Sequence, residues 1–132
     1  MRMIADTNVI VRAVVGDDEV QSRAARQALS SAEQVIIGRH AFCEMAWVLR
    51  QSYKFPKTAI LSAIRGYLDA DNVITDSGAI EAGLKAMEAG GDFADGVIAY
   101  EGQWLGGEMF VSFDKQAVAA VAKLGQNARL LT

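Results

Sequence analysis

Cysteine, histidine and proline are almost absent from this sequence of 132 residues, which contains one of each: Cys43, His40 and Pro56. A single cysteine cannot form an internal disulfide, and one thiol with one imidazole cannot complete a zinc site built from such ligands. Stabilisation by disulfides or by such a zinc site is therefore excluded. A reducing cytoplasm is the expected location of the chain.

An excess of basic charge is also missing. Lys and Arg number 13 and Asp and Glu 16, so the formal net charge is −3 and no overall positive field draws nucleic acid or an anionic membrane to the protein. Any contact with nucleic acid must depend on a local basic patch or on metal ions. No stretch approaches the ~18 to 20 apolar residues of a membrane span, and the start lacks the basic-then-apolar run of a signal peptide. We therefore expect a soluble protein that is not exported.

Apolar residues are plentiful by comparison. They make up 52% of the chain, with a mean hydropathy of +0.16, whereas roughly 45 to 50% is usual for a soluble domain. A chain of this length can bury one core, and we expect a single domain over residues 1–132. The surplus predicts that some apolar surface meets another chain.

Short apolar runs alternate with longer amphipathic stretches along the sequence. Five strands are predicted at residues 2–5, 34–37, 72–75, 109–113 and 128–131, because each run is too short for a helix. Helices are predicted at residues 8–15, 18–31, 39–53, 57–69, 77–89, 93–105 and 115–124. Strict alternation of this kind is typical of an α/β sandwich with a mainly parallel sheet.

Two of the predicted strands end on an aspartate that is followed by a helix: MIAD ends at Asp6 and FVSFD at Asp114. In parallel sheets of this type, ligands bind beyond the carboxyl ends of the strands. Both carboxylates are therefore candidates for a site at one edge of the sheet. The alternative is that each is a helix N-cap, a role in which Asp contributes ~1 kcal/mol.

Another candidate acid lies in the segment GGDFADGVIAYEG, where Asp92 and Asp95 stand at the start of a helix. Asp92 suits the N-cap position of that helix. Asp95 shares its helix face with Ile98, Ala99 and Gly102, a small apolar face that is expected to pack inward. A carboxylate on an inward face needs a cation or several hydrogen-bond donors.

The fourth acid, Glu44, lies in RHAFCEMAWVLRQSY. At 100° per residue, His40, Glu44 and Gln51 share one narrow polar stripe of the predicted helix. Glu44 is then either a solvated residue on this stripe or a carboxylate that faces the edge of the sheet.

The segments IADTNV, FCEMAWVL, DFADGVIA and FVSFD, which contain Asp6, Glu44, Asp95 and Asp114 in this order, resemble the PIN-domain family and most closely its VapC-type toxin ribonucleases. The likeness extends over essentially the whole chain. It implies a three-layer α/β/α sandwich around a mainly parallel, five-stranded sheet. It also implies a Mg²⁺- or Mn²⁺-dependent endoribonuclease, in which these four acids are the catalytic and metal-binding residues.

The same resemblance implies supporting roles for Asn8 in DTN, for Ser112 in SFD and for Asp92. It further implies that the protein is the toxin of a type II toxin-antitoxin pair, inhibited by a cognate small antitoxin protein, and that it forms a homodimer.

Electrostatics agrees with a metal site in such a cluster. Two carboxylates 4 Å apart repel by ~4 kcal/mol even at an effective dielectric constant of 20, so a cluster must take up protons or a cation. Oxygen-only ligands with a net negative charge favour a hard divalent ion such as Mg²⁺. A ribonuclease without metal would usually need imidazoles as general acid and base, and the chain has one.

Contact with the substrate must be local, given the acidic balance. Arg50, Lys54 and Lys57, at the end of the Glu44 helix and in the next turn, are the predicted substrate-binding residues. Arg12, Arg23, Arg26, Arg39 and Arg65 are further candidates, although charged residues on helices more often form a solvated face. Single-stranded or looped RNA is the expected target, because unstacked bases can reach a recessed site.

Of three other interpretations, the first two fit poorly and the third is open. A phosphatase of the haloacid-dehalogenase type also begins with a strand that ends on Asp, but it needs a second Asp where Asn8 stands. A response-regulator receiver needs a phosphoacceptor Asp after a middle strand, where QVIIG is followed by Arg39. The third is a PIN-like module that binds RNA or protein without turnover.

Overall fold

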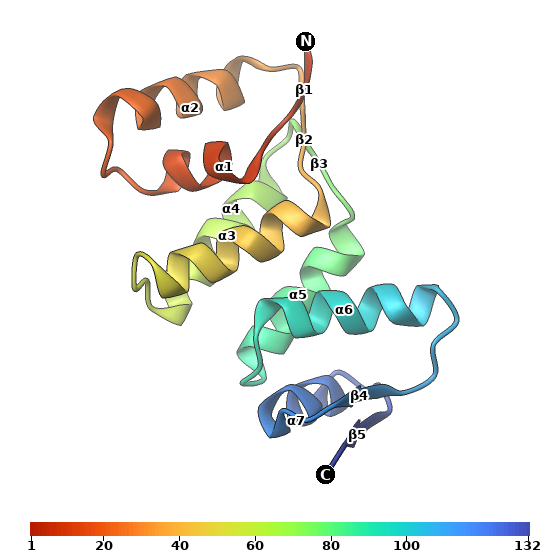
Figure 1. Ribbon diagram of the computed structural model, residues 1–132. Coiled ribbons are helices and arrows are strands. Elements are labelled where there is room, and N and C mark those ends of the chain that lie inside the picture. Colours follow the sequence, from red (N-terminus) through yellow and green to blue (C-terminus); the bar gives the residue numbers. More distant parts are fainter. The chain divides into compact units, whose positions relative to one another are not determined.

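The computed structural model describes all 132 residues, and the chain divides into two compact units. Unit 1 comprises Met1–Thr75 and unit 2 comprises Asp76–Thr132 (Figure 1). None of the helices combines the length and the apolar character that crossing a bilayer requires.

Unit 1 contains a parallel sheet of three strands with four helices. Strand β2 lies in the middle, with Met3 of β1 opposite Val35 and Val35 opposite Val73 of β3. The elements follow one another as β1 (Arg2–Ile4), α1 (Thr7–Val14), α2 (Glu19–Ser31), β2 (Gln34–Ile36), α3 (Arg39–Gln51), α4 (Lys57–Asp69) and β3 (Val73–Ile74).

Large side chains fill the core of unit 1. Those of Ile10, Phe42, Leu49 and Ile64 have no exposed surface, and burial of each contributes ~1.5 to 3 kcal/mol. The ring of Phe42 packs edge-on against Tyr67, whose hydroxyl donates a 2.6 Å hydrogen bond to the carbonyl oxygen of Ile10. This contact ties α4 to α1 and thereby fixes the helix that follows Asp6.

Unit 2 contains three helices and a pair of parallel strands. Ser112 of β4 lies opposite Leu130 of β5, and β4 and β5 both contact α7. The elements are α5 (Ser77–Glu88), α6 (Phe93–Trp104), β4 (Phe110–Ser112), α7 (Lys115–Lys123) and β5 (Ala128–Leu130).

Helices α5 and α6 lie against each other (Figure 1), and glycines allow their close approach. A Cβ atom on Gly96 would collide with the carbonyl group of Ala82, and one on Gly83 would come within 2.5 Å of the Phe93 ring. The two backbones therefore approach to a distance that only a residue without a side chain permits.

Aspartates begin most of the helices. The side chains of Asp6, Asp18, Asp76 and Asp114 accept hydrogen bonds from backbone N–H groups in the first turns of α1, α2, α5 and α7. Such caps satisfy donors that have no partner within the helix. Downstream of α5, Gly90 has a φ of 101°, a conformation that glycine adopts without strain.

The predicted elements agree with the observed ones to within two residues at each end. All five strands are present, three in unit 1 and two in unit 2, and every observed strand pair is parallel. The α/β/α fold class is therefore confirmed. The single five-stranded sheet is wrong in one respect, because the strands form two hydrogen-bonded sheets of three and of two strands. The expectation of a single domain over residues 1–132 stays a prediction beside the two compact units.

Candidate functional site

Asp6 lies where β1 gives way to α1. The ladder of β1 reaches Ala5, whose N–H donates a 3.0 Å hydrogen bond to the carbonyl oxygen of Ile36. Asp6 then turns the chain and caps α1, with its Oδ1 accepting a 2.8 Å hydrogen bond from the N–H of Thr7. The side chain is exposed. The cap interpretation is correct, and it uses only one of the two carboxylate oxygens.

Glu44 meets α1 from the neighbouring helix α3. The Thr7 hydroxyl donates a 2.9 Å hydrogen bond to Oε1 of Glu44, and the His40 Nε2 lies 3.1 Å from the same oxygen. The predicted polar stripe is confirmed, because His40, Glu44 and Gln51 are all exposed. Glu44 is nevertheless not merely solvated, since Thr7 connects it to the residue next to Asp6.

A cavity of about 350 Å³ collects these groups within unit 1. Asp6, Thr7, Asn8 and Glu44 line it together with Val11, Arg12, Val48 and Tyr53. Two acids that lie far apart in the sequence thus share one pocket, and Asn8 joins them as predicted. Thr7 and Tyr53 were not predicted as site residues, although Thr7 stands between two that were.

In unit 2, Asp95 is half-buried at the start of α6. Its Oδ2 accepts a 2.9 Å hydrogen bond from the N–H of Asp92, which precedes the helix. Burial raises the pKa of the Asp95 carboxyl above its usual range, and the charges of Asp92 and Asp114 raise it further, against the opposing effect of that hydrogen bond. The three aspartates are therefore close enough to repel one another.

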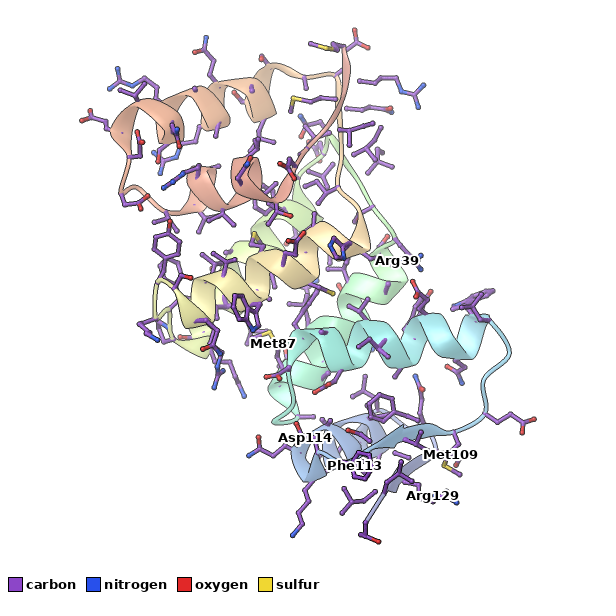
Figure 2. The ribbon with its side chains drawn as sticks, in the orientation of Figure 1. Arg39, Met87, Met109, Phe113, Asp114 and Arg129 are labelled. Carbon is purple, nitrogen blue, oxygen red and sulfur yellow. The ribbon has the colours of Figure 1, made fainter.

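Asp114 stands at the start of α7, directly after Phe113, where Figure 2 labels both. Its Oδ1 accepts hydrogen bonds of 2.9 and 3.4 Å from the N–H groups of Gln116 and Ala117. The N–H of Asp114 donates a 3.0 Å hydrogen bond to the Ser112 hydroxyl. Ser112 thus supports the turn that carries the acid.

All four acids share one property. Each is anchored through a single carboxylate oxygen: Oδ1 of Asp6, Oε1 of Glu44, Oδ2 of Asp95 and Oδ1 of Asp114. The other oxygen of each has no hydrogen bond within the protein. Anchored carboxylates with one unengaged oxygen are oriented acceptors for a cation or for a water molecule.

The carboxylate oxygens of the four acids are of the chemical type that binds a divalent ion. They are hard oxygens, which Mg²⁺ and Mn²⁺ prefer, and a half-buried carboxylate beside two like charges has the instability that a cation relieves. Neither unit on its own gathers three or more His, Cys, Asp or Glu side chains that could hold a metal ion.

The predicted inward face of α6 is partly wrong. Ala99 is buried, but Ile98 is 58% exposed. Ile98 lines a larger cavity of unit 2, of about 670 Å³, between α6 and the segments that carry β4 and β5. That cavity contains none of the predicted site residues, so the acids and the larger cavity are separate features of unit 2.

The predicted substrate-binding residues lie outside the pocket of unit 1. Arg50 is in the last turn of α3, Lys54 is in the following turn with a φ of 56°, and Lys57 is the first residue of α4; all three are exposed. Arg12 is instead the basic residue that lines the cavity with the acids.

Comparison with known proteins gives one finding beyond the structure. No curated protein matches the chain. The PIN domain family, however, matches residues 3–124, which is most of the sequence. PIN domains are generally divalent-metal-dependent nucleases, which implies a nucleic-acid substrate. The chain belongs to the PIN domain family.

Proposed function

We propose that this protein is a metal-dependent endoribonuclease. The observation that carries the proposal is that Asp6, Glu44, Asp95 and Asp114 each keep one carboxylate oxygen unengaged while the other is anchored. Membership of a family of nucleases supports the same assignment.

Asp6, Glu44, Asp95 and Asp114 are the proposed ligands of Mg²⁺ or Mn²⁺. When bound, the ion supplies Lewis-acid activation of water and of the scissile phosphate. Thr7 and His40 hold Glu44, while backbone N–H groups hold Asp6, Asp95 and Asp114, so the ligand oxygens are oriented in advance.

Three further residues have supporting roles in this proposal. Asp92 fixes Asp95 through its backbone N–H, and its own charge adds to the demand for a cation. Ser112 fixes the backbone of Asp114. Asn8 offers an uncharged amide to the pocket beside Asp6, where it can hold a water molecule or a phosphate oxygen.

Cleavage of a labelled single-stranded RNA tests the proposal. We expect cleavage with Mg²⁺ or Mn²⁺ and none with a chelator. Asp6→Asn and Asp95→Asn should each lower the rate by at least about 100-fold, because partners that merely orient a metal ligand already cost 10- to 100-fold. Asn keeps the shape and one acceptor oxygen, so the fold should persist.

Asp18→Asn provides the matched control. Asp18 caps α2 as Asp6 caps α1, accepting a 3.0 Å hydrogen bond from the N–H of Gln21, but it is not one of the four acids. The Asp18→Asn variant should cleave RNA as the wild type does. If the wild type cleaves no RNA with either ion, the protein is instead a PIN-like binding module without turnover.

We further propose that the protein acts in the cytoplasm as the toxin of a type II toxin-antitoxin pair and forms a homodimer. The large apolar share of the sequence supports contact with another chain. Expression with and without the neighbouring small gene tests the pairing, and growth arrest is expected only in its absence. Light scattering of the purified chain tests the dimer, which a monomer mass would rule out.

A further inference from the structure

The pocket of unit 1 has a second end that the acids do not use. Helix α1 is joined to α3 by Thr7 and Glu44 near the start of α1. In its last turn it meets the segment that follows α3, where Nη1 of Arg12 lies 3.4 Å from the Tyr53 hydroxyl oxygen. Thr7 and Arg12 are five residues apart, or about 7 to 8 Å along the helix at 1.5 Å per residue. Both places line the same cavity.

Arg12 is held in place at this end. Its Nη1 donates a 2.9 Å hydrogen bond to Oδ1 of Asp17. That hydrogen bond, with the attraction between the two charges, raises the pKa of the guanidinium above its ordinary value. Burial alone would raise the pKa of Asp17, but hydrogen bonds from Arg12 and Tyr53 hold it below its usual range. Both residues therefore stay charged.

The fixed guanidinium still has donors for a ligand. Its contacts with Asp17 and Tyr53 both use Nη1, whereas Nε and Nη2 make no hydrogen bond within the protein. The side chain is 33% exposed. A planar group with two parallel donors on one side matches a phosphate, which it can bind through two hydrogen bonds.

The rest of this end is apolar and aromatic. Val11 is buried, Val48 and Tyr53 are half-buried, and the Tyr53 ring meets Phe55 edge-on at 6.5 Å. Unstacked bases of single-stranded nucleic acid commonly pack on such tyrosine rings. This end of the pocket thus offers a cation for the phosphate of a nucleotide and an aromatic ring for its base.

We propose that this end of the pocket binds a nucleotide that flanks the bond to be cleaved, with its phosphate on Arg12 and its nucleoside against Val48 and Tyr53. This inference rests on the proposed function. The separation along α1 makes the phosphate at Arg12 a different group from the phosphate at the acids, about two nucleotides along a strand that rises about 3.4 Å per stacked nucleotide. Asp17 acts as a positioning residue for Arg12.

Fluorescence anisotropy of an end-labelled single-stranded oligoribonucleotide, measured in EDTA over a series of salt concentrations, tests the inference without turnover. We expect Arg12→Ala to weaken binding about 10-fold, as loss of a charged hydrogen bond does. The slope of log affinity against log salt should fall by about one, since one phosphate contact is lost.

Arg12→Lys separates charge from shape. It should keep the salt slope, because the positive charge remains, but lose part of the affinity, because an ammonium cannot replace the planar pair of donors. If circular dichroism shows that Arg12→Ala does not fold, the Arg12→Lys variant alone tests whether Arg12 binds the phosphate.

Arg2→Ala is the matched control. The Arg2 side chain also makes a hydrogen bond, from Nε to Oε1 of Gln34 at 2.9 Å, but Arg2 is exposed on β1 and lies outside the pocket. The affinity and the salt slope of this variant should equal those of the wild type.

The inference is overturned if the wild type does not bind the oligoribonucleotide, or if both Arg12 variants bind it as the wild type does. Metal-dependent cleavage by the wild type together with unchanged binding by the variants would remove this subsite and leave the proposed function standing. If Arg12→Ala binds more weakly but the wild type never cleaves RNA, the nucleotide site at Arg12 stands and the proposed function is removed.

Discussion

Helices pack in different ways in unit 1 and in unit 2. In unit 1 the fully buried side chains are large, among them Phe42, Leu49, Ile60 and Ile64. In unit 2 the contact between α5 and α6 depends on glycine and alanine, with Gly96 against the backbone of Ala82. Unit 2 also buries large side chains, among them Ile80 and Leu84, so both units are stabilised by buried apolar area, and unit 2 by the close approach of two helices in addition. Substitutions that remove atoms from the core should damage either unit, whereas those that add atoms at helix glycines should damage unit 2.

The acids differ between the units in a parallel way. Asp6 and Glu44 are exposed, and Thr7 and His40 donate to or lie beside them. Asp95 is half-buried beside two other aspartates, and its pKa is raised. Unit 1 thus presents exposed acids held by neighbouring donors, whereas in unit 2 the half-buried Asp95 carboxyl lies beside two like charges whose repulsion a cation would offset.

Truncation of a large core residue in unit 1 should have the largest effect on stability. Ile64→Ala is expected to lower the free energy of unfolding by about 3 kcal/mol, through lost burial and the cavity left behind. Urea denaturation followed by circular dichroism measures this. Val20→Ala, at a side chain that is 80% exposed on α2, should change it by less than about 0.5 kcal/mol. Equal effects of the two would contradict the assignment of the core.

Addition of one methyl group should damage unit 2 somewhat less. Gly96→Ala forces the new Cβ onto the Ala82 carbonyl and is expected to cost about 2 kcal/mol. Gly102→Ala, in the same helix but with open space around it, should stabilise by up to about 1 kcal/mol, because alanine favours the helix. The test is whether the two variants change the free energy of unfolding in opposite directions. Hydrogen exchange should show the loss of protection caused by Gly96→Ala in peptides from residues 76–132.

The smallest effects concern the carboxyl groups and depend on pH. The pKa of Asp95 is raised in the folded protein, so its ionised form costs stability above that pKa and nothing below its unfolded value. Asp95→Asn should therefore raise the melting temperature at neutral pH, with a gain that disappears in acid, while abolishing cleavage.

Asp17 should respond in the opposite direction. Its pKa is lowered, so its stabilisation is present above the ordinary carboxyl value and is lost as the pH falls through the lowered one. Asp17→Asn should lower the melting temperature at neutral pH and have no effect in strong acid. Melting curves that moved the same way for both variants would contradict the contrast between the two units.

Local sequence patterns were sufficient for the elements and for the positions of Asp6, Glu44 and Asp114 within them. Short apolar runs bounded by glycines and aspartates mark the strands and the helix starts, because caps and turns are set by residues within a few positions. The same locality explains why Asp6 and Asp114 could be placed at strand ends, and why Glu44 could be assigned to a polar stripe of α3.

Contacts between distant elements were not predictable in this way. Arg12 reaches Tyr53 only because α1 packs on α3, and no spacing in either segment encodes that pairing. Basic character alone directed attention to Arg50 and Lys54, which lie outside the pocket. Ile98 shows the same limit, because helical period gives the face of a residue but not what covers it.

Each unit carries one tryptophan, Trp47 on α3 and Trp104 at the end of α6, and both indoles are largely exposed. Replacement of either by phenylalanine leaves a single emitter confined to one half of the chain. Trp47 is one turn from Glu44, whereas Trp104 is the last residue of the helix that carries Asp95 near its start. Iodide quenching of the remaining indole would therefore report separately, and without any added dye, on access to the surface beside Glu44 and on access to the far end of α6.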